Sequence, residues 1–111
     1  MKISLQICKK ELDLIKSGTK KKEFRSPSKF NMKILTIQNL EIKDKYILIG
    51  NPEITEIEFL NGYSKVREKL TIKCKGIRLV RFQNNVDEPD NNFKALEGQV
   101  AIEILLGEII K

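Results

Sequence analysis

Alternating or continuous apolar positions mark several segments of this chain, and this is the pattern of β-strands that bury one face or both. These segments are residues 2–7, 54–60, 69–82 and 99–106, with shorter strands predicted near 33–38 and 45–49. Gly76 lies inside the longest segment, where we expect a bend or a bulge. Gly107 is expected to end the last strand.

The hydrophobic period changes after the first strand to that of a helix. Cys8, Leu12 and Ile15 share one helical face, while the lysines between them face water. Gly18 follows as a C-terminal stop. We therefore predict one helix over about residues 9–17, followed by a strand over 20–25.

Polar runs and turn residues predict the connections. Residues 26–31 are loop by composition, and residues 83–92 form a polar, acidic loop with no packing signal. Asn61-Gly62 is a strong β-hairpin signal. One helix, five or six strands and no βαβ spacing predict an α+β, mostly β fold, built as a compact barrel with helical segments at its rim.

Length and composition indicate a single domain. A chain of 111 residues with 41% apolar positions suits one globular core, so residues 1–111 are treated as one unit. No apolar run reaches the roughly 18 residues that cross a membrane. The segment from Ile3 to Cys8 is too short and too polar for a signal peptide, so we expect a cytoplasmic protein.

The absence of histidine narrows the candidate chemistry. Histidine-dependent catalytic triads and the usual zinc ligand sets are excluded, and no metal or cofactor site is predicted. Cys8 and Cys74 show no metal-ligand spacing. Both lie in apolar, strand-like sequence, where a free cysteine is usually a small buried hydrophobe.

Positive charge is concentrated in the first third of the chain. The net charge is +6, and residues 1–33 carry ten lysines and arginines against three acids, whereas residues 34–111 carry eleven against twelve. The densest stretch is SGTKKKEFRS, residues 17–26. A local positive field attracts phosphates and nucleic acid. Solvated lysines explain the same composition without any partner.

Three pieces of sequence, in their order and spacing, carry a family resemblance. They are the helix end with TKKKEFR, the hairpin EFLNGYSK (58–65), and LTIKCKGIR (70–78) with LLGEII (105–110). The chain resembles the ASCH domain, a branch of the PUA-like fold, in the small single-domain form common in phage genomes. The family signature GxKxxExR is matched by Gly18, Lys20, Glu23 and Arg25.

The resemblance implies both a fold and two functions. The fold is a PUA-like β-barrel of five to six strands with a cleft beside the first helix, and its members are thought to bind RNA or modified nucleosides. One subset resembles an amidohydrolase of acetylated cytidine, with a catalytic lysine, a threonine two residues before the motif arginine, and a distant glutamate. Lys20 matches the lysine, but Glu23 stands at the threonine position, and Thr19 is four residues away.

Strand alternation divides the basic stretch into two faces. By alternation, Lys20, Lys22 and Phe24 share one face, and Lys21, Glu23 and Arg25 share the other. We expect Lys20 to reach the second face from the helix–strand junction, because a twisted rim does not keep ideal alternation. Glu23 and Arg25 are either an ion pair that holds a loop, or a ligand-facing pair in which the arginine offers a planar fork.

The hairpin supplies the remaining candidates. Turn geometry alone explains Asn61. Tyr63 is either packed on the end of the barrel or exposed as a platform on which a base stacks, and Phe30 has the same two options.

These observations lead to two hypotheses. The first is a non-catalytic module that binds RNA or a modified nucleotide in a basic cleft beside the first helix. The residues expected to bind the ligand are Lys20, Glu23, Arg25, Asn61 and Tyr63. The alternative is a small amidohydrolase of acylated nucleosides such as acetylcytidine, in which Lys20 and Glu23 share a proton to activate water.

Overall fold

A computed structural model of the chain describes residues 1–42 and 45–110, leaving aside the side chains of residues 38–48. The strands are β1 (Lys2–Gln6), β2 (Lys22–Arg25), β3 (Thr36–Ile42), β4 (Lys45–Gly50), β5 (Glu56–Asn61), β6 (Glu68–Arg81), β7 (Val86–Glu88), β8 (Phe93–Ala95) and β9 (Val100–Ile110). The helices are α1 (Lys9–Lys16), α2 (Lys29–Leu35) and the short 3₁₀ turn η1 (Pro89–Asn91). The prediction of a mostly β fold with one helix near residues 9–17 is confirmed, and α2 is additional.

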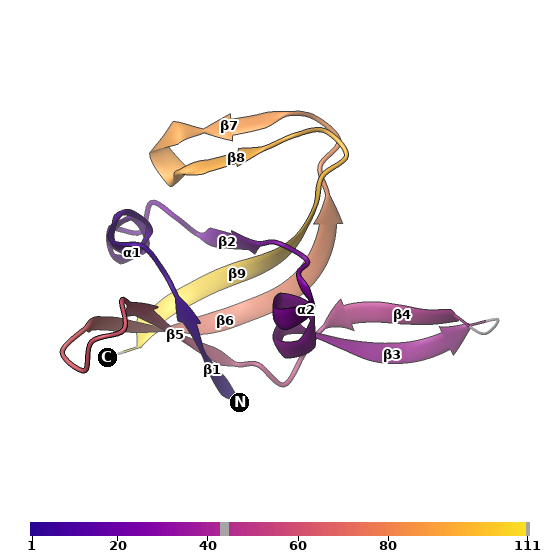
Figure 1. Ribbon diagram of the computed structural model, residues 1–111, viewed down its shortest axis with the longest axis horizontal. Helices are drawn as coiled ribbons and strands as arrows, with labels where there is room; N and C mark the ends of the chain where they lie inside the picture. The colour runs from indigo at the N-terminus through magenta and orange to yellow at the C-terminus, as the bar shows by residue number, and fades with distance from the viewer. Residues whose placement is uncertain (43–44, 111) are drawn as a thin grey trace.

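Five strands form one mixed sheet in the order β1-β5-β6-β9-β2. β1 runs parallel to β5, and the other neighbours are antiparallel. Two separate hairpins, β3–β4 and β7–β8, complete the described elements, and Figure 1 shows β3–β4 extending away from the main sheet. Within the described residues the strand ladder does not close into a barrel, because β1 and β2 are its two edges.

The core lies where α1 packs against the five-stranded sheet. The alternation predicted for β1, β5 and β6 is confirmed, because Leu5, Ile57 and Ile72 are buried. Leu12 and Ile15 form the buried face of α1. Each such side chain contributes about 1.5–3 kcal/mol on burial, so this packing fixes the helix over the sheet. No helix of the described residues is long and apolar enough to cross a membrane.

Cys8 departs from the predicted helical face. It is the N-cap residue of α1, it is exposed, and its thiol donates a hydrogen bond to Glu11 Oε2 at 3.4 Å. The expectation of a buried thiol is wrong for this residue, because its extended backbone places it before the first helical turn. Cys74 in β6 is half-buried, and both cysteines are free.

The segment predicted as the loop 26–31 contains the start of α2. Ser28 caps this helix, because its hydroxyl accepts a hydrogen bond from the Asn31 backbone N–H at 3.2 Å. Leu35 at the other end is buried in the core. The loop prediction therefore missed a capping serine. The strands predicted near 33–38 and 45–49 correspond to β3, which starts later, and to β4.

The two glycines predicted to shape long strands have different outcomes. The pairing of β6 with β9 shifts register on either side of Cys74 and up to Gly76, so the bulge is confirmed. Gly107 does not end β9, which continues to Ile110. A Cβ added at Gly107 would lie 3.0 Å from the Lys73 carbonyl oxygen, so glycine here permits close approach to β6 instead of a stop.

The region 83–92 is not the featureless loop that its polarity predicts. It contains β7 and η1 and leads into β8, and the resulting hairpin packs on β2 through an aromatic cluster. The ring of Phe93 stacks on that of Phe24 with centroids 4.3 Å apart, and Phe82 contacts both rings. The packing signal came from residues outside the polar run.

Candidate functional site

The turn after α1 sets the position of Lys20. Gly18 has a φ of +78°, a conformation that glycine adopts without strain, and the chain reverses there. The backbone N–H groups of Thr19 and Lys20 both donate to the carbonyl of Leu14, at 3.1 and 3.0 Å. The reversal brings the Lys20 side chain back beneath the helix toward Glu11.

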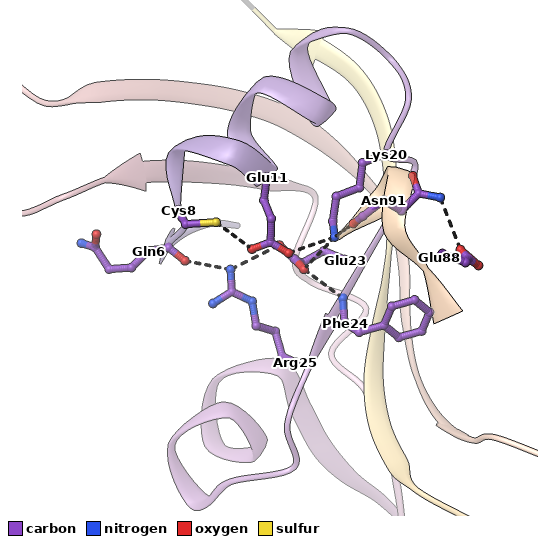
Figure 2. A network of polar contacts seen from close by, with 9 residues as sticks. All are labelled: Gln6, Cys8, Glu11, Lys20, Glu23, Phe24, Arg25, Glu88 and Asn91. Carbon is purple, nitrogen blue, oxygen red and sulfur yellow. Dashed lines mark hydrogen bonds and ion pairs between the residues drawn. The ribbon is translucent and has the colours of Figure 1, made fainter. Parts of the chain in front are cut away.

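Lys20 is buried and fully engaged. Its side chain is 2% exposed. Its Nζ lies 3.1 Å from Glu11 Oε1 and 3.7 Å from Glu23 Oε1, and it donates to the carbonyl of Asn91 at 3.2 Å. Two hydrogen bonds and one ion pair hold the ammonium group. Lys20 therefore joins α1, β2 and η1 at one point, as Figure 2 shows.

Glu23 is the most buried carboxylate of the group. Its side chain is 3% exposed, and Oε1 accepts a hydrogen bond from the Phe24 backbone N–H at 3.1 Å. Burial raises the pKa of Glu23, and the positive charges of Arg25 and Lys20 only partly offset this effect. Glu23 is therefore a carboxyl group that takes up a proton more readily than an exposed glutamate.

Arg25 joins the two edge strands of the sheet. Its Nη2 donates to the carbonyl of Gln6 at 2.8 Å and lies 3.5 Å from Glu23 Oε2. The side chain is 21% exposed and lines a cavity. Arg25 thus forms the ion pair with Glu23 and also borders a cavity, so the two arrangements predicted as alternatives do not exclude each other.

A cavity of about 420 Å³ opens beside this cluster, and we call it the charged cleft. The residues that line it are Gln6, Ile7, Cys8, Glu11, Glu23, Phe24, Arg25, Gly62 and Tyr63. Two carboxylates, Glu11 and Glu23, balance the charges of Arg25 and the adjacent Lys20. The cleft is therefore rich in charge but close to neutral overall, unlike the basic cleft expected from the lysine run.

The hairpin candidates divide in their placement. Tyr63 is 86% exposed and lines the charged cleft, so its ring is not packed on the sheet. Asn61 does not line the cleft, and its Nδ2 donates to the carbonyl of Ile7 at 2.9 Å, which is a structural contact. Phe30 is exposed on α2 and also lies outside the cleft lining.

Strand alternation separates the charged residues of β2 as expected, because Glu23 and Arg25 line the charged cleft, whereas Lys22 lines a second cavity on the other side and Phe24 borders both. Lys20 and Lys21 depart from the prediction. Lys20 was expected in the cleft and Lys21 shares the parity of Glu23, but both precede β2 and line the second cavity with Thr19. Figure 2 shows the Phe24 ring pointing away from Arg25, on the side of Asn91.

Sequence reasoning missed Glu11 and Gln6. Glu11 flanks the buried stripe of α1, and the only signal for it was a single acid among lysines in the first turn. Gln6 is the last residue of β1. When the oxygen and nitrogen of its amide are assigned from their hydrogen-bond partners, the nitrogen donates to the carbonyls of Leu60 and Gly62 at 3.0 and 2.9 Å. This contact ties the loop that carries Tyr63 to the edge strand.

The donor set does not resemble a metal centre. Among the side chains of residues 1–37 and 49–110, no group of three metal-ligating residues comes together. The two carboxylates that approach each other are bridged by a lysine. The charged cleft therefore presents hydrogen-bond donors and acceptors, which suit a polar organic ligand.

Comparison of the chain with protein-family models, curated proteins and solved structures found no significant match. The ASCH resemblance consequently stays a prediction from motif spacing, and the site is interpreted from its own geometry.

Proposed function

We propose that the chain is an ASCH-type, PUA-like module that binds RNA without catalysis, holding one nucleobase or modified base in the charged cleft. The observation that carries this proposal is the combination, in one cavity, of an arginine fork, an accessible carboxylate and an exposed aromatic ring. Arg25, Glu11 and Tyr63 supply these three groups. Each has a recognised use in holding a base.

The polar groups of the cleft complement the edge of a base. Arginine donates to paired acceptors, and a glutamate accepts from an exocyclic amino group. Arg25 lines the cleft, and its contacts with Gln6 and Glu23 both use Nη2, so we infer that Nη1 and Nε serve the ligand. Glu11 is 22% exposed and so has an oxygen within reach of a ligand. Lys20, being buried, positions this carboxylate.

Tyr63 supplies the stacking surface. Tyr63 belongs to the loop 62–67, lines the charged cleft and is 86% exposed. Stacking of one base on an aromatic side chain contributes about 1–3 kcal/mol, independent of base identity. Tyr63 therefore supplies affinity, while Arg25 and Glu11 supply selectivity.

The contacts of Lys20 favour binding over catalysis. A lysine that serves as a general base needs a free amine, whereas the Lys20 side chain donates to Glu11 and to the Asn91 carbonyl and forms an ion pair with Glu23. The threonine of the related amidohydrolases is replaced by Glu23. Thr19 lines the other cavity, and its hydroxyl is engaged with Ser17 Oγ at 3.0 Å.

One observation supports the alternative of an amidohydrolase. Burial raises the pKa of Glu23, which is the change expected of a carboxyl group that transfers protons near neutral pH. In that reaction water adds to the acetyl carbonyl, the C–N bond breaks, and acetate and the free exocyclic amine leave. Incubation with N4-acetylcytidine and assay of released acetate tests it, with Glu23→Gln as the control. Release of acetate by both proteins, or by neither, contradicts the enzymatic role.

Cys8 offers a direct test of where RNA binds. It is exposed and lines the charged cleft, whereas Cys74 is half-buried and lines a different cavity. A mixed-sequence single-stranded 12-nucleotide RNA at saturating concentration should slow alkylation of Cys8 by iodoacetamide at least fivefold and leave Cys74 unchanged. Binding without protection of Cys8 would place the ligand elsewhere. Absence of binding would contradict the proposed function itself.

A further inference from the structure

A second cavity of about 380 Å³ lies between β2 and the β7–β8 hairpin, which both contribute to its lining, and we call it the phenylalanine cavity. Its lining includes the aromatic rings of Phe24, Phe82 and Phe93, the exposed lysines Lys21 and Lys22 and the amide of Asn91, together with Thr19, Lys20, Val86, Glu88 and Glu103. Apart from Lys20, which positions Glu11, none of these residues has a role in base recognition in the charged cleft, although Phe24 borders both cavities.

The three rings form a partly exposed apolar wall. Phe24 and Phe93 are stacked, with centroids 4.3 Å apart, and Phe82 is tilted against both at 5.4 and 5.5 Å. All three side chains keep part of their surface accessible. Part of the apolar surface of these rings remains in contact with water. An apolar or aromatic ligand that covers this surface is stabilised by burying it.

Two lysines stand beside this wall. Lys21 and Lys22 are both exposed, and Lys22 lies 3.8 Å from Glu103, a carboxylate that Arg78 already neutralises at 2.6 Å. Lys22 is therefore available to a second anion at little cost, since Glu103 keeps its arginine partner. The two ammonium groups suit a phosphate, which a lysine binds as a point charge.

Asn91 supplies a polar contact inside the cavity. Its Oδ1 is buried and has no hydrogen-bond donor among the described residues, and its Nδ2 makes one long bond, of 3.3 Å, to Glu88. A buried acceptor without a partner costs about 1–3 kcal/mol. If the Asn91 amide turns toward an N–H group of a ligand, it loses the long bond from Nδ2 to Glu88. In exchange, Oδ1 accepts a hydrogen bond from the ligand.

We infer that the phenylalanine cavity binds a second nucleotide of the same RNA strand, with its base against the phenylalanine rings, an N–H of that base on Asn91, and its phosphate on Lys21 and Lys22. This inference rests on the proposed function, because it extends the strand from the charged cleft across β2. A nucleotide is the ligand class that joins a flat ring, an N–H donor and an anion. The two cavities are adjacent, since Phe24 lines both.

Chemical-shift mapping with defined ligands tests this inference. The ¹⁵N-labelled protein is titrated with AMP, CMP, GMP and UMP, with the matching nucleosides, with inorganic phosphate and with single-stranded RNA trinucleotides. The monophosphates should shift the Lys21 and Lys22 backbone amides and the Asn91 side-chain amide. Phosphate alone should shift only the lysine signals. A trinucleotide should also shift Tyr63 and bind at least tenfold more tightly than any monophosphate.

The outcomes separate the two proposals. Shifts confined to Arg25, Tyr63 and their neighbours overturn the second site and leave the proposed function standing. Shifts confined to the phenylalanine cavity support the second site and overturn base binding in the charged cleft. No shifts with any ligand overturn both. A trinucleotide that binds no more tightly than a monophosphate overturns the continuous strand.

Two variants sharpen the result. Asn91→Leu keeps the backbone carbonyl that holds Lys20 and removes the side-chain acceptor, so monophosphate affinity at the phenylalanine cavity should fall at least fivefold. Asn84→Leu is the matched control, because Asn84 is exposed and lies outside the cavity. Equal affinities of the two variants would remove Asn91 from the site.

Discussion

The two sides of β2 differ in whether their charged side chains are buried or exposed to solvent. On one side, Glu23 is buried, and the buried Lys20, which borders the other side, lies between it and Glu11. On the other, Lys21 and Lys22 are exposed beside a wall of aromatic rings. The three consecutive lysines therefore occupy two different environments, one buried and one exposed to solvent. The buried ammonium group of Lys20 holds neighbouring carboxylates in place, whereas the exposed ammonium groups of Lys21 and Lys22 are available to attract an anionic ligand.

This difference follows from the geometry of a short strand after a tight turn. Residues of a strand alternate between its faces, so β2 divides its own side chains between two cavities. Lys20 precedes β2, so the turn at Gly18, and not the alternation of the strand, determines the direction of its side chain. A charge count over residues 17–26 averages the two environments and overstates the positive character of the charged cleft.

The largest effect that separates the two sides is on stability. Lys20→Met should lower the free energy of unfolding by about 3–5 kcal/mol, because it leaves Glu23 and Glu11 near each other without their shared cation. Lys21→Met is the matched control and should change stability by no more than about 0.5 kcal/mol, because Lys21 is exposed. Urea denaturation measures both. Equal losses in the two variants would contradict the buried role of Lys20.

The next effect is on selective binding. Arg25→Lys keeps the charge but loses the planar fork, so affinity for the preferred RNA should fall roughly tenfold to hundredfold, while affinity for a random RNA should barely change. Arg81→Lys is the control, since Arg81 is exposed and its hydrogen bond to the Gly98 carbonyl is 3.5 Å long. Parallel loss of both affinities in Arg25→Lys would mean that the stretch is a generic basic surface.

A smaller effect concerns pH. The pKa of Glu23 is raised in the folded state, so the unfolded chain loses this proton first as the pH rises above about 4.5. Wild-type stability should therefore fall relative to that of Glu23→Gln as the pH rises from 4.5 toward the folded pKa, and the difference should then stay constant. Urea denaturation from pH 4 to 8 measures it. A wild type that gains on the variant with rising pH would show that the ion pairs outweigh burial.

The strands with clean alternation and the first helix could be predicted from sequence, because local period alone determines which face is buried. The division of β2 into two faces followed from the same rule. Other features depend on contacts between distant segments. The β7–β8 hairpin packs through Phe24 and Phe93, which lie far apart in sequence, and its polar residues gave no sign of this.

The site itself was predictable only in part. Motif spacing pointed to Lys20, Glu23 and Arg25, and these residues do come together. Glu11 could not be found in the same way, because its contact with Lys20 depends on the reversal of the chain at Gly18. The open edge between β1 and β2 also escaped prediction, since strand count alone does not determine whether a sheet closes.

The most direct test of the account is the salt dependence of RNA binding in two variants. The affinity of a single-stranded 12-nucleotide RNA is measured between 50 and 300 mM KCl, and the slope of log affinity against log salt reports the phosphate contacts, at about 0.7 for each in single strands. Lys21→Ala/Lys22→Ala should reduce the magnitude of the slope by about 1.4. Tyr63→Leu should lower affinity roughly tenfold or more with the slope unchanged. An unchanged slope in the double lysine variant, or equal slope changes in both variants, would contradict the separate roles of the two sides of β2.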